Sequence, residues 1–243
     1  MMVDASASPL LLPAQHHQDA VDRGLALIPA GKAAEALKIL GREARNNRLD
    51  ANAQHAYGVA LHHTRQFEEA LEQFHRADRL KPRRWQIYQN LGASLHGLKR
   101  YEEAYAATLE SLKLNPDNVY AAYHLADVNQ IFGDLPEAVH WYRKTLEIDP
   151  DMVAAWIGLM FTLDLMPETT PEMALAERRA FSRQFETPLS RFRRPHLNTK
   201  DPNRQIRIGY ISGDFRDHTA AYMWGPIFEH HDRDRFQVFS YAD

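Results

Sequence analysis

Residues of the same kind recur every 34 positions along the first two thirds of this chain. The prolines form one series, Pro82, Pro116 and Pro150. Two further series keep the same interval: Ala36, Ala70, Ala104 and Ala138, and Gly24, Gly58, Gly92 and Ala126. A fixed period of this length is typical of proteins built from small units that bury their apolar faces only by stacking on one another. The period therefore predicts a solenoid over this part of the chain.

The period and its residues resemble the tetratricopeptide repeat, a unit of two helices joined by a turn. With proline as position 32, the units span residues 17 to 50, 51 to 84, 85 to 118 and 119 to 152, and the first helix of a fifth spans about 153 to 166. The small residues stand where helices cross, because Gly and Ala let two backbones approach while a side chain such as Phe74 fills the space beside them. Arg48 replaces the proline of the first unit, as expected of a terminal repeat.

The period ends near residue 166, and the pattern changes there. Residues 172 to 185 predict one more helix, and an apolar segment at residues 205 to 212 precedes a helix at 219 to 229 and a second apolar segment at 236 to 241. Strand, helix, strand is the start of an α/β sheet. The expected fold class is mostly α, a tetratricopeptide solenoid followed by the start of an α/β domain. The expected domains are an N-terminal tail (1–16), the repeats (17–166), a helix and basic linker (167–204) and an incomplete α/β lobe (205–243).

Composition narrows the possible compartments and chemistries. The chain has 243 residues, a net charge of -3 and no cysteine, which excludes disulfides and thiolate chemistry and is compatible with a reducing compartment. The N-terminal segment lacks the basic and apolar regions of a signal peptide, and no stretch approaches the ~20 apolar residues of a membrane helix. We therefore expect a cytoplasmic protein without a membrane partner.

A basic segment and a large number of histidines suggest nucleic acid and metal ions as partners, but we expect neither. Residues 178 to 207 form the one basic block, but it lacks interleaved aromatic residues and lies at a domain junction, where arginines commonly pair with carboxylates. Nucleic acid is therefore not an expected partner. The chain also has 13 histidines, including the adjacent pair His62 and His63, but side chains of neighbouring residues diverge on a helix and no H-x-x-x-H spacing occurs. No metal site is expected.

A loop after the first predicted strand carries the strongest candidates for chemistry. Residues 213 to 218 lie where the carboxyl end of a strand meets a helix, the place where ligands gather in open α/β sheets. His218 suits proton handling or contact with an anionic or hydroxylic ligand, since imidazole titrates near neutrality. The alternative is structural, with Asp217 or His218 capping the helix and Asp214 ending the strand. Spacing alone favours the structural alternative.

The stretch RIGYISGDFRDH from Arg207 to His218, followed by an apolar helix and by FEHHDRDRFQVFSY from Phe228 to Tyr241, resembles the start of the catalytic region of the O-linked N-acetylglucosamine transferases, the bacterial members most of all. As in that family, it follows tetratricopeptide repeats. The resemblance implies a Rossmann-like glycosyltransferase of two lobes. In such an enzyme, a Ser or Thr hydroxyl of an acceptor protein attacks the anomeric carbon of UDP-N-acetylglucosamine (UDP-GlcNAc) with inversion, and no cofactor besides this donor is needed.

On this resemblance His218 matches the family's histidine at the active-site cleft, as a general base or a substrate contact, with Asp217 and Asp214 as supporting candidates. The chain stops at Asp243, two strands into the first lobe, whereas the family binds uridine diphosphate mostly in the second lobe. The second catalytic lobe is therefore absent from this chain, and we expect these 243 residues alone to be inactive. The alternative to a glycosyltransferase is a tetratricopeptide scaffold that binds proteins without catalysis.

The repeats themselves predict a peptide groove. In stacked repeats the first helix of each unit faces the concave surface at positions 2, 5, 9, 12 and 13. These positions carry amide, imidazole and aromatic side chains: His55, His62, His63, Gln86, Gln89, His96, Tyr120, Tyr123, Asp127, Gln130, Ile157 and Phe161. Such a lining suits a polar, partly apolar segment of an acceptor protein. The alternative is that several of these side chains pack against the next helix.

The residues expected to hold the acceptor are His55, His62, Gln89, Asn90, Tyr120 and Tyr123. Asn90 is included because eukaryotic relatives in the resembled family line this groove with an asparagine at position 6 of each unit. Here position 6 holds Asp22, Ala56, Asn90, His124 and Gly158, so only one unit matches. A ladder of asparagines along a peptide backbone is therefore not expected.

Overall fold

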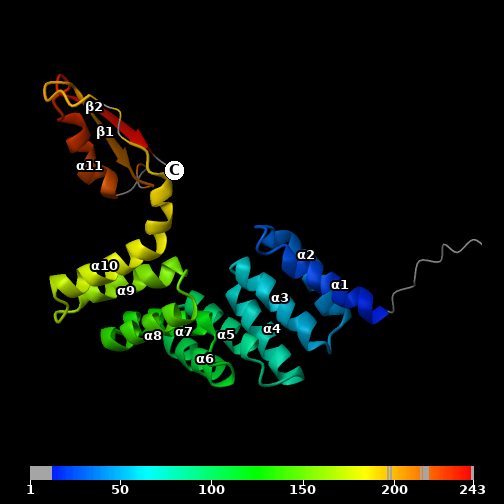
Figure 1. Cartoon of the computed structure of the whole chain (residues 1–243). Helices are drawn as coiled ribbons and strands as arrows, with labels where there is room; N and C mark the ends of the chain where they lie inside the picture. The colour runs from blue at the N-terminus through cyan, green and yellow to red at the C-terminus, as the bar shows by residue number, and fades with distance from the viewer. Residues whose placement is uncertain (1–12, 196, 198, 214, 216–218, 242–243) are drawn as a thin grey trace, which may run out of the picture. The chain divides into compact units, whose positions relative to one another are not determined.

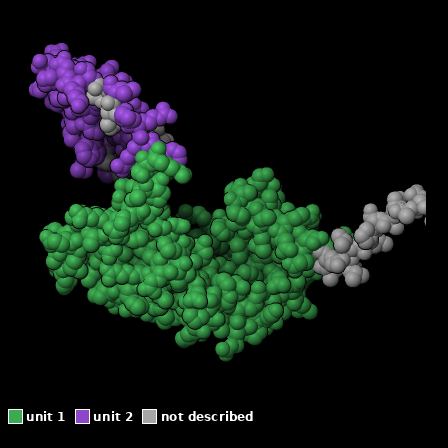
Figure 2. Space-filling view, viewed as in Figure 1, with its two compact units in different colours: residues 1–191 green, residues 192–243 purple. Residues whose placement is uncertain are grey.

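The computed structural model describes residues 13 to 241, apart from residues 196, 198, 214 and 216 to 218. The chain divides into two compact units, residues 1 to 191 and residues 192 to 243 (Figure 2). The described residues of the first unit form ten α-helices: α1 (Pro13–Ala26), α2 (Ala33–Asn46), α3 (Ala51–His63), α4 (Phe67–Leu80), α5 (Trp85–Gly97), α6 (Tyr101–Leu114), α7 (Val119–Phe132), α8 (Leu135–Ile148), α9 (Val153–Leu165) and α10 (Pro171–Phe185). A short 3-10 helix, η1 (Thr187–Phe192), follows.

Consecutive helices of the first unit pack against each other, as expected for a stack of two-helix units (Figure 1). The first helices of successive units also meet, α1 with α3, α3 with α5, α5 with α7, and α7 with α9. Among the described residues the second helices make no comparable contact with one another. The first helices therefore form a closely spaced inner layer and the second helices a more widely spaced outer layer. The predicted solenoid of repeats is confirmed.

Side chains that cap helix N-termini fix where several helices begin. The Asp50 carboxylate accepts hydrogen bonds from the backbone N–H groups of Asn52 and Ala53 at 2.6 and 3.2 Å and starts α3. Asn118 does the same for α7, and Asp134 for α8. Each cap satisfies N–H groups that have no partner inside the helix. These residues therefore fix where α3, α7 and α8 begin.

The turn inside each unit also repeats every 34 residues. Gly31, Arg65, Lys99 and Gly133 all have left-handed backbone conformations, with φ between 61° and 81°. Each stands at position 15 of its unit, between the first and the second helix. Glycine adopts this conformation without a steric penalty, whereas a residue with a Cβ is strained in it. The tight turn is therefore kept even in the two units that lack a glycine there.

The two layers approach closely where a small residue faces a large one. A Cβ built on Gly58 would lie 2.5 Å from the ring of Phe74, and one on Gly158 would lie 2.4 Å from the ring of Tyr142. Both rings are almost fully buried, with exposed fractions of 0% and 1%. The expected packing of Gly58 against Phe74 is confirmed. It explains why a small residue recurs every 34 positions in the series of Gly58, whereas Gly158 stands at position 6 of its unit.

Helix α1 is longer than the repeat count predicts, and helix α10 differs from the other helices in its burial. Helix α1 begins at Pro13, so residues 13 to 16, placed in the N-terminal tail by the repeat count, are part of the helix. Proline favours the first position of a helix, where its missing N–H group leaves no hydrogen bond unmade.

Helix α10 packs against α9 but has no buried residue. It is held by polar contacts at its surface, including an ion pair of 2.6 Å between Arg178 and Asp164.

The second unit contains the predicted strand, helix and strand. They are β1 (Ile206–Ile211), α11 (Thr219–Glu229) and β2 (Phe236–Tyr241). The strands pair in parallel, with Ile206 opposite Phe236 and Ile211 opposite Tyr241. The described residues contain this two-stranded sheet and no further strand, so a complete Rossmann-like lobe is not present among them. None of the helices in the described part of the chain combines the length and apolar character needed to cross a lipid bilayer.

Candidate functional site

Large apolar side chains stand exposed on the inner layer of first helices. Tyr120 of α7 and Ile157 and Phe161 of α9 have exposed fractions of 56%, 57% and 56%. All three occupy positions predicted to face the groove. Figure 2 shows that the surface of the first unit is hollowed between the two ends of the helix stack. Exposed apolar side chains on one face commonly mark a surface that another molecule covers.

Other predicted groove residues bind neighbouring helices instead. The Asn90 side-chain amide lies 2.8 Å from Nε2 of His55, which joins α5 to α3. Nδ1 of His62 lies 2.9 Å from the Ser94 hydroxyl across the same two helices. Gln89 is half-buried, and among the described residues its Oε1 atom has no hydrogen-bond partner. Polar groups of this end of the inner layer therefore hold the first helices in register, as the alternative interpretation expected of several of them.

Four histidines come together in one cleft of the inner layer. His62 and His63 of α3, His96 of α5 and His124 of α7 line a hollow of about 430 Å³. The rings of His62 and His63 are 5.3 Å apart, and those of His96 and His124 are 6.1 Å apart. Among the described residues, Nε2 of His96 and Nδ1 of His124 are buried without a hydrogen-bond partner. Unmade hydrogen bonds of buried groups are unfavourable, so these atoms would gain from a polar ligand in the cleft.

Burial disfavours the charged form of four histidines of the inner layer. It lowers the pKa of His55, His62 and His124 to about 4, and it also lowers the pKa of His63. Arg84 adds to the effect at His55, and the neighbouring imidazoles add to it at His62 and His124. A neutral imidazole has one N–H donor and one nitrogen acceptor. At neutral pH these imidazoles therefore offer hydrogen bonds in both directions, and Arg65, which also lines the cleft, adds a positive charge.

A half-buried carboxylate stands on α7, the helix that carries His124. The Tyr142 hydroxyl donates a hydrogen bond of 2.7 Å to Asp127, which stands on α7. Burial raises the pKa of Asp127, while the hydroxyl bonds from Tyr142 and Tyr123 oppose that rise. Burial and the nearby carboxylate raise the pKa of Tyr123 to about 12. Tyr123 and Asp127 thus belong to a polar network between α7 and α8.

The loop that carries the catalytic candidates is described only in part. Asp214, Asp217 and His218 lie outside the described residues. Beside the loop, at the carboxyl end of β1, is a hollow of about 290 Å³ lined by Tyr210, Ile211, Ser212, Phe215, Trp224 and Phe228. Most of this lining is aromatic or aliphatic. The roles of the three candidates stay predictions.

The sequence did not single out the histidine cleft as one site. His62, His63 and His96 were predicted on the groove, but His124 stands at position 6, where an asparagine ladder would run. The fold brings it to His96, 28 residues earlier in the chain, because α5 and α7 are adjacent first helices. Among the described residues, no group of three or more His, Asp or Glu side chains is arranged to hold a metal ion.

Comparison with known proteins identifies the helical repeats. Tetratricopeptide repeat profiles match residues 21 to 84 and residues 85 to 118. These residues are tetratricopeptide repeats. The chain is 30% identical over 94 residues to tetratricopeptide repeat protein 37 of Xenopus laevis, matching 39% of this chain and 6% of that protein. It is 31% identical over 96 residues to the probable UDP-N-acetylglucosamine–peptide N-acetylglucosaminyltransferase SPINDLY of Arabidopsis thaliana, matching 40% of this chain and 10% of that protein.

Solved structures share the fold at lower identity. An O-GlcNAc transferase of Thermobaculum terrenum superposes with a TM-score of 0.57 at 23% identity, over 79% of this chain and 37% of that one. YrrB, described as a tetratricopeptide protein with an unusual peptide-binding site, superposes with a TM-score of 0.54 at 18% identity, over 70% of this chain and 87% of that one. Similarity to the transferases lies in the repeats and does not show a catalytic region.

Proposed function

We propose that the first unit binds an extended segment of another protein along its inner layer. The observation that carries the proposal is the exposure of Tyr120, Ile157 and Phe161, each more than half exposed, on the face formed by the first helices. These side chains would bury apolar groups of the partner. Tetratricopeptide repeats of other proteins bind peptides, which agrees with the description of YrrB.

The histidine cleft gives this surface hydrogen-bonding groups for polar side chains of the partner. His62, His96 and His124 lie a short distance along the inner layer from the exposed apolar residues, and burial keeps His62 and His124 neutral at pH 7. Hydroxyl and amide groups can both donate to and accept from a neutral imidazole. Segments rich in Ser, Thr, Asn and Gln with intervening apolar residues therefore fit this surface best.

Binding of labelled synthetic peptides tests the proposal. Peptides of about ten residues, which span roughly 33 Å when extended, would combine Ser and Thr with Leu or Val. Fluorescence anisotropy should show binding that the double substitution Ile157→Ser and Phe161→Ser weakens by about tenfold, because two apolar contacts are lost. Leu49→Ser with Met173→Ser is the matched control, since both residues are exposed but stand away from the predicted groove positions. Equal losses in the two double variants would refute the inner layer as the binding surface.

We further propose that the chain is the N-terminal part of a protein O-glycosyltransferase that uses UDP-GlcNAc, with the inner layer holding the acceptor. Three observations support this: the stretch from Arg207 to His218, the strand, helix and strand that follow the repeats, and the similarity of those repeats to the transferases. His218 is the proposed catalytic residue, supported by Asp217 and Asp214. A scaffold without catalysis is the alternative, and it agrees equally well with the repeats.

Sugar transfer distinguishes the enzyme from the scaffold. The longest natural polypeptide that contains these residues should transfer labelled GlcNAc from UDP-GlcNAc to a Ser/Thr peptide that binds the inner layer. His218→Ala should reduce transfer by at least about a hundredfold while peptide binding is kept, since a general base contributes about that much. The 243-residue chain alone should bind the peptide without transferring sugar. Peptide binding with no transfer by the natural polypeptide would favour the scaffold.

A further inference from the structure

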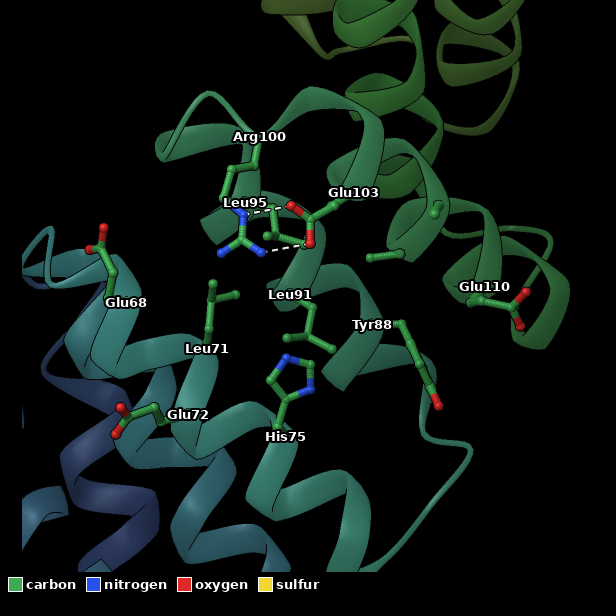
Figure 3. Close-up of a pocket in the computed structure, with 12 residues that line it drawn as sticks. Glu68, Leu71, Glu72, His75, Tyr88, Leu91, Leu95, Arg100, Glu103 and Glu110 are labelled. Carbon is green, nitrogen blue, oxygen red and sulfur yellow. Dashed lines mark hydrogen bonds and ion pairs between the residues drawn. The ribbon is translucent and has the colours of Figure 1, made fainter.

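The outer layer contains an apolar hollow between two second helices. It lies between α4 and α6, above α5, and has a volume of about 560 Å³ (Figure 3). The floor is formed by Tyr88, Leu91 and Leu95 of α5, and Leu71 of α4 closes one side. We call this hollow the outer groove. It is separate from the histidine cleft, since it is lined by the second helices and by the opposite face of α5.

The outer groove is open because of two small residues on α6. Ala106 and Ala107 form its second wall, so no long side chain reaches from α6 over the leucines. One repeat later the residue equivalent to Ala107 is Trp141. Trp141 packs against the apolar cluster of Leu112, Ala121 and Leu125, in which Leu125 is the equivalent of Leu91. We infer that its indole takes up the corresponding space between α6 and α8. The two consecutive units thus have the same backbone fold, but a large side chain occupies this space in one of them and not in the other.

The rim of the outer groove is acidic. Glu68 and Glu72 stand on the α4 wall, and Glu103 and Glu110 stand on the α6 wall (Figure 3). Arg100 donates two hydrogen bonds of 2.6 Å to Glu103, and Lys113 pairs with Glu110. His75 completes the polar lining. Carboxylates therefore outnumber the cationic side chains around an apolar floor, which gives the groove a negative rim.

We propose that the outer groove binds a basic amphipathic helix of a partner protein. An apolar side chain of the partner, of the size of Leu or Phe, would occupy the space above Leu71, Leu91 and Leu95 that Trp141 fills in the next unit. Lysine or arginine residues beside it would face Glu68 and Glu72. Helices that enter grooves in this way present apolar residues at i, i+3, i+4 and i+7, with charged residues on either side. This second binding surface is independent of the inner layer, so two partners could bind the repeats at once.

A designed peptide tests both parts of the proposal. The probe is a labelled helix of about 14 residues with Leu at i, i+3, i+4 and i+7 and Lys elsewhere. Ala107→Trp should weaken its binding by about tenfold or more, because the indole takes the place of the peptide's apolar side chain. Glu68→Gln with Glu72→Gln should weaken binding by about tenfold at low salt and by less at high salt, because solvent screens exposed charges.

Matched controls distinguish binding in the outer groove from nonspecific electrostatic attraction between the basic probe and the protein. Glu69→Gln with Glu102→Gln removes two exposed carboxylates from the same two helices outside the groove, and it should leave binding unchanged. Circular dichroism and thermal unfolding should show that every variant is folded. Three results would overturn the proposal: equal effects of the two glutamate pairs, unchanged binding by Ala107→Trp, or equal binding of a probe in which Ser replaces Leu. Self-association of the protein that Ala107→Trp abolishes would show that a second copy, not a basic helix, is the occupant.

Discussion

The inner and outer layers of the repeats share one backbone period but carry different polar chemistry. Polar groups of the inner layer bond from helix to helix, as His55 does with Asn90 and Gln130 does with Thr162. In the outer layer, several ion pairs lie within one exposed helix, as between Lys144 and Glu147, and Arg143 of α8 pairs with Glu177 of α10 at the surface. Burial keeps His55, His62 and His124 of the inner layer neutral, whereas Lys144 and Glu147 of the outer layer are charged and exposed. The stability of the inner layer should therefore depend on pH, whereas the exposed ion pairs of the outer layer should contribute little to stability.

The contact that joins the two layers should have the largest effect on stability. Phe74 of α4 is fully buried against Gly58 of α3, with an exposed fraction of 0%. Phe74→Ala should lower the free energy of unfolding by about 3–5 kcal/mol, because it removes a buried ring and leaves a cavity between the layers. Urea unfolding followed by circular dichroism measures this loss. Gln73→Ala, a change at the neighbouring half-exposed position, should alter stability by less than about 0.5 kcal/mol.

The inner layer should make the protein less stable in acid. Burial lowers the pKa of His55 and His124 from 6.5 to about 4. Between these values the unfolded chain binds protons that the folded chain does not, so the free energy of unfolding falls as pH falls through this window. The slope is up to about 1.4 kcal/mol per pH unit for each such histidine. The lowered pKa values of His62 and His63 act in the same direction, while the raised pKa of Asp127 acts against it.

Replacing one inner histidine should reduce this dependence. His124→Gln cannot take up a proton near neutral pH, so the loss of stability between about pH 7 and pH 5 should shrink by roughly 1–2 kcal/mol. His75→Gln serves as the control, because His75 is exposed on the outer layer. Urea unfolding of the three proteins at both pH values checks the prediction. If His124→Gln and the original chain lose the same stability, the cleft does not cause the acid sensitivity.

The helices were predictable because repeated residues carry repeated physical roles. The period located Gly58 against Phe74, and the apolar segments that follow the repeats predicted the strand, helix and strand near the C-terminus, since both depend on local sequence pattern. The left-handed turns at Arg65 and Lys99 were not predictable, because neither residue favours that conformation. Backbone hydrogen bonds at the end of the first helix close these turns, as from the Gln66 N–H to the Leu61 carbonyl.

The sites were predictable only in part, because they depend on contacts between repeats. Sequence positions indicated that Tyr120 and His62 face the inner side, but not that His62 bonds to Ser94 or that His124 joins the cleft. The outer groove arises from a missing side chain at Ala107, and it becomes visible only when that residue is compared with Trp141 of the next unit. A pattern of residue types predicts which face of a helix carries a side chain. The residue that this side chain contacts depends on the spacing between helices, which the pattern does not give.

The smallest effect is expected from the ion pair of Arg100 and Glu103 on the outer layer. The guanidinium donates two hydrogen bonds of 2.6 Å to the carboxylate, yet the Arg100 and Glu103 side chains are 47% and 57% exposed. Solvent screens such pairs, and Glu103 also lies in the first turn of α6, where the helix dipole favours its charge without the arginine. Arg100→Gln should therefore leave the urea midpoint unchanged within error, at low salt and at high salt. A clear loss of stability at low salt that disappears at high salt would show that the outer layer, like the inner one, depends on its polar pairs for folding.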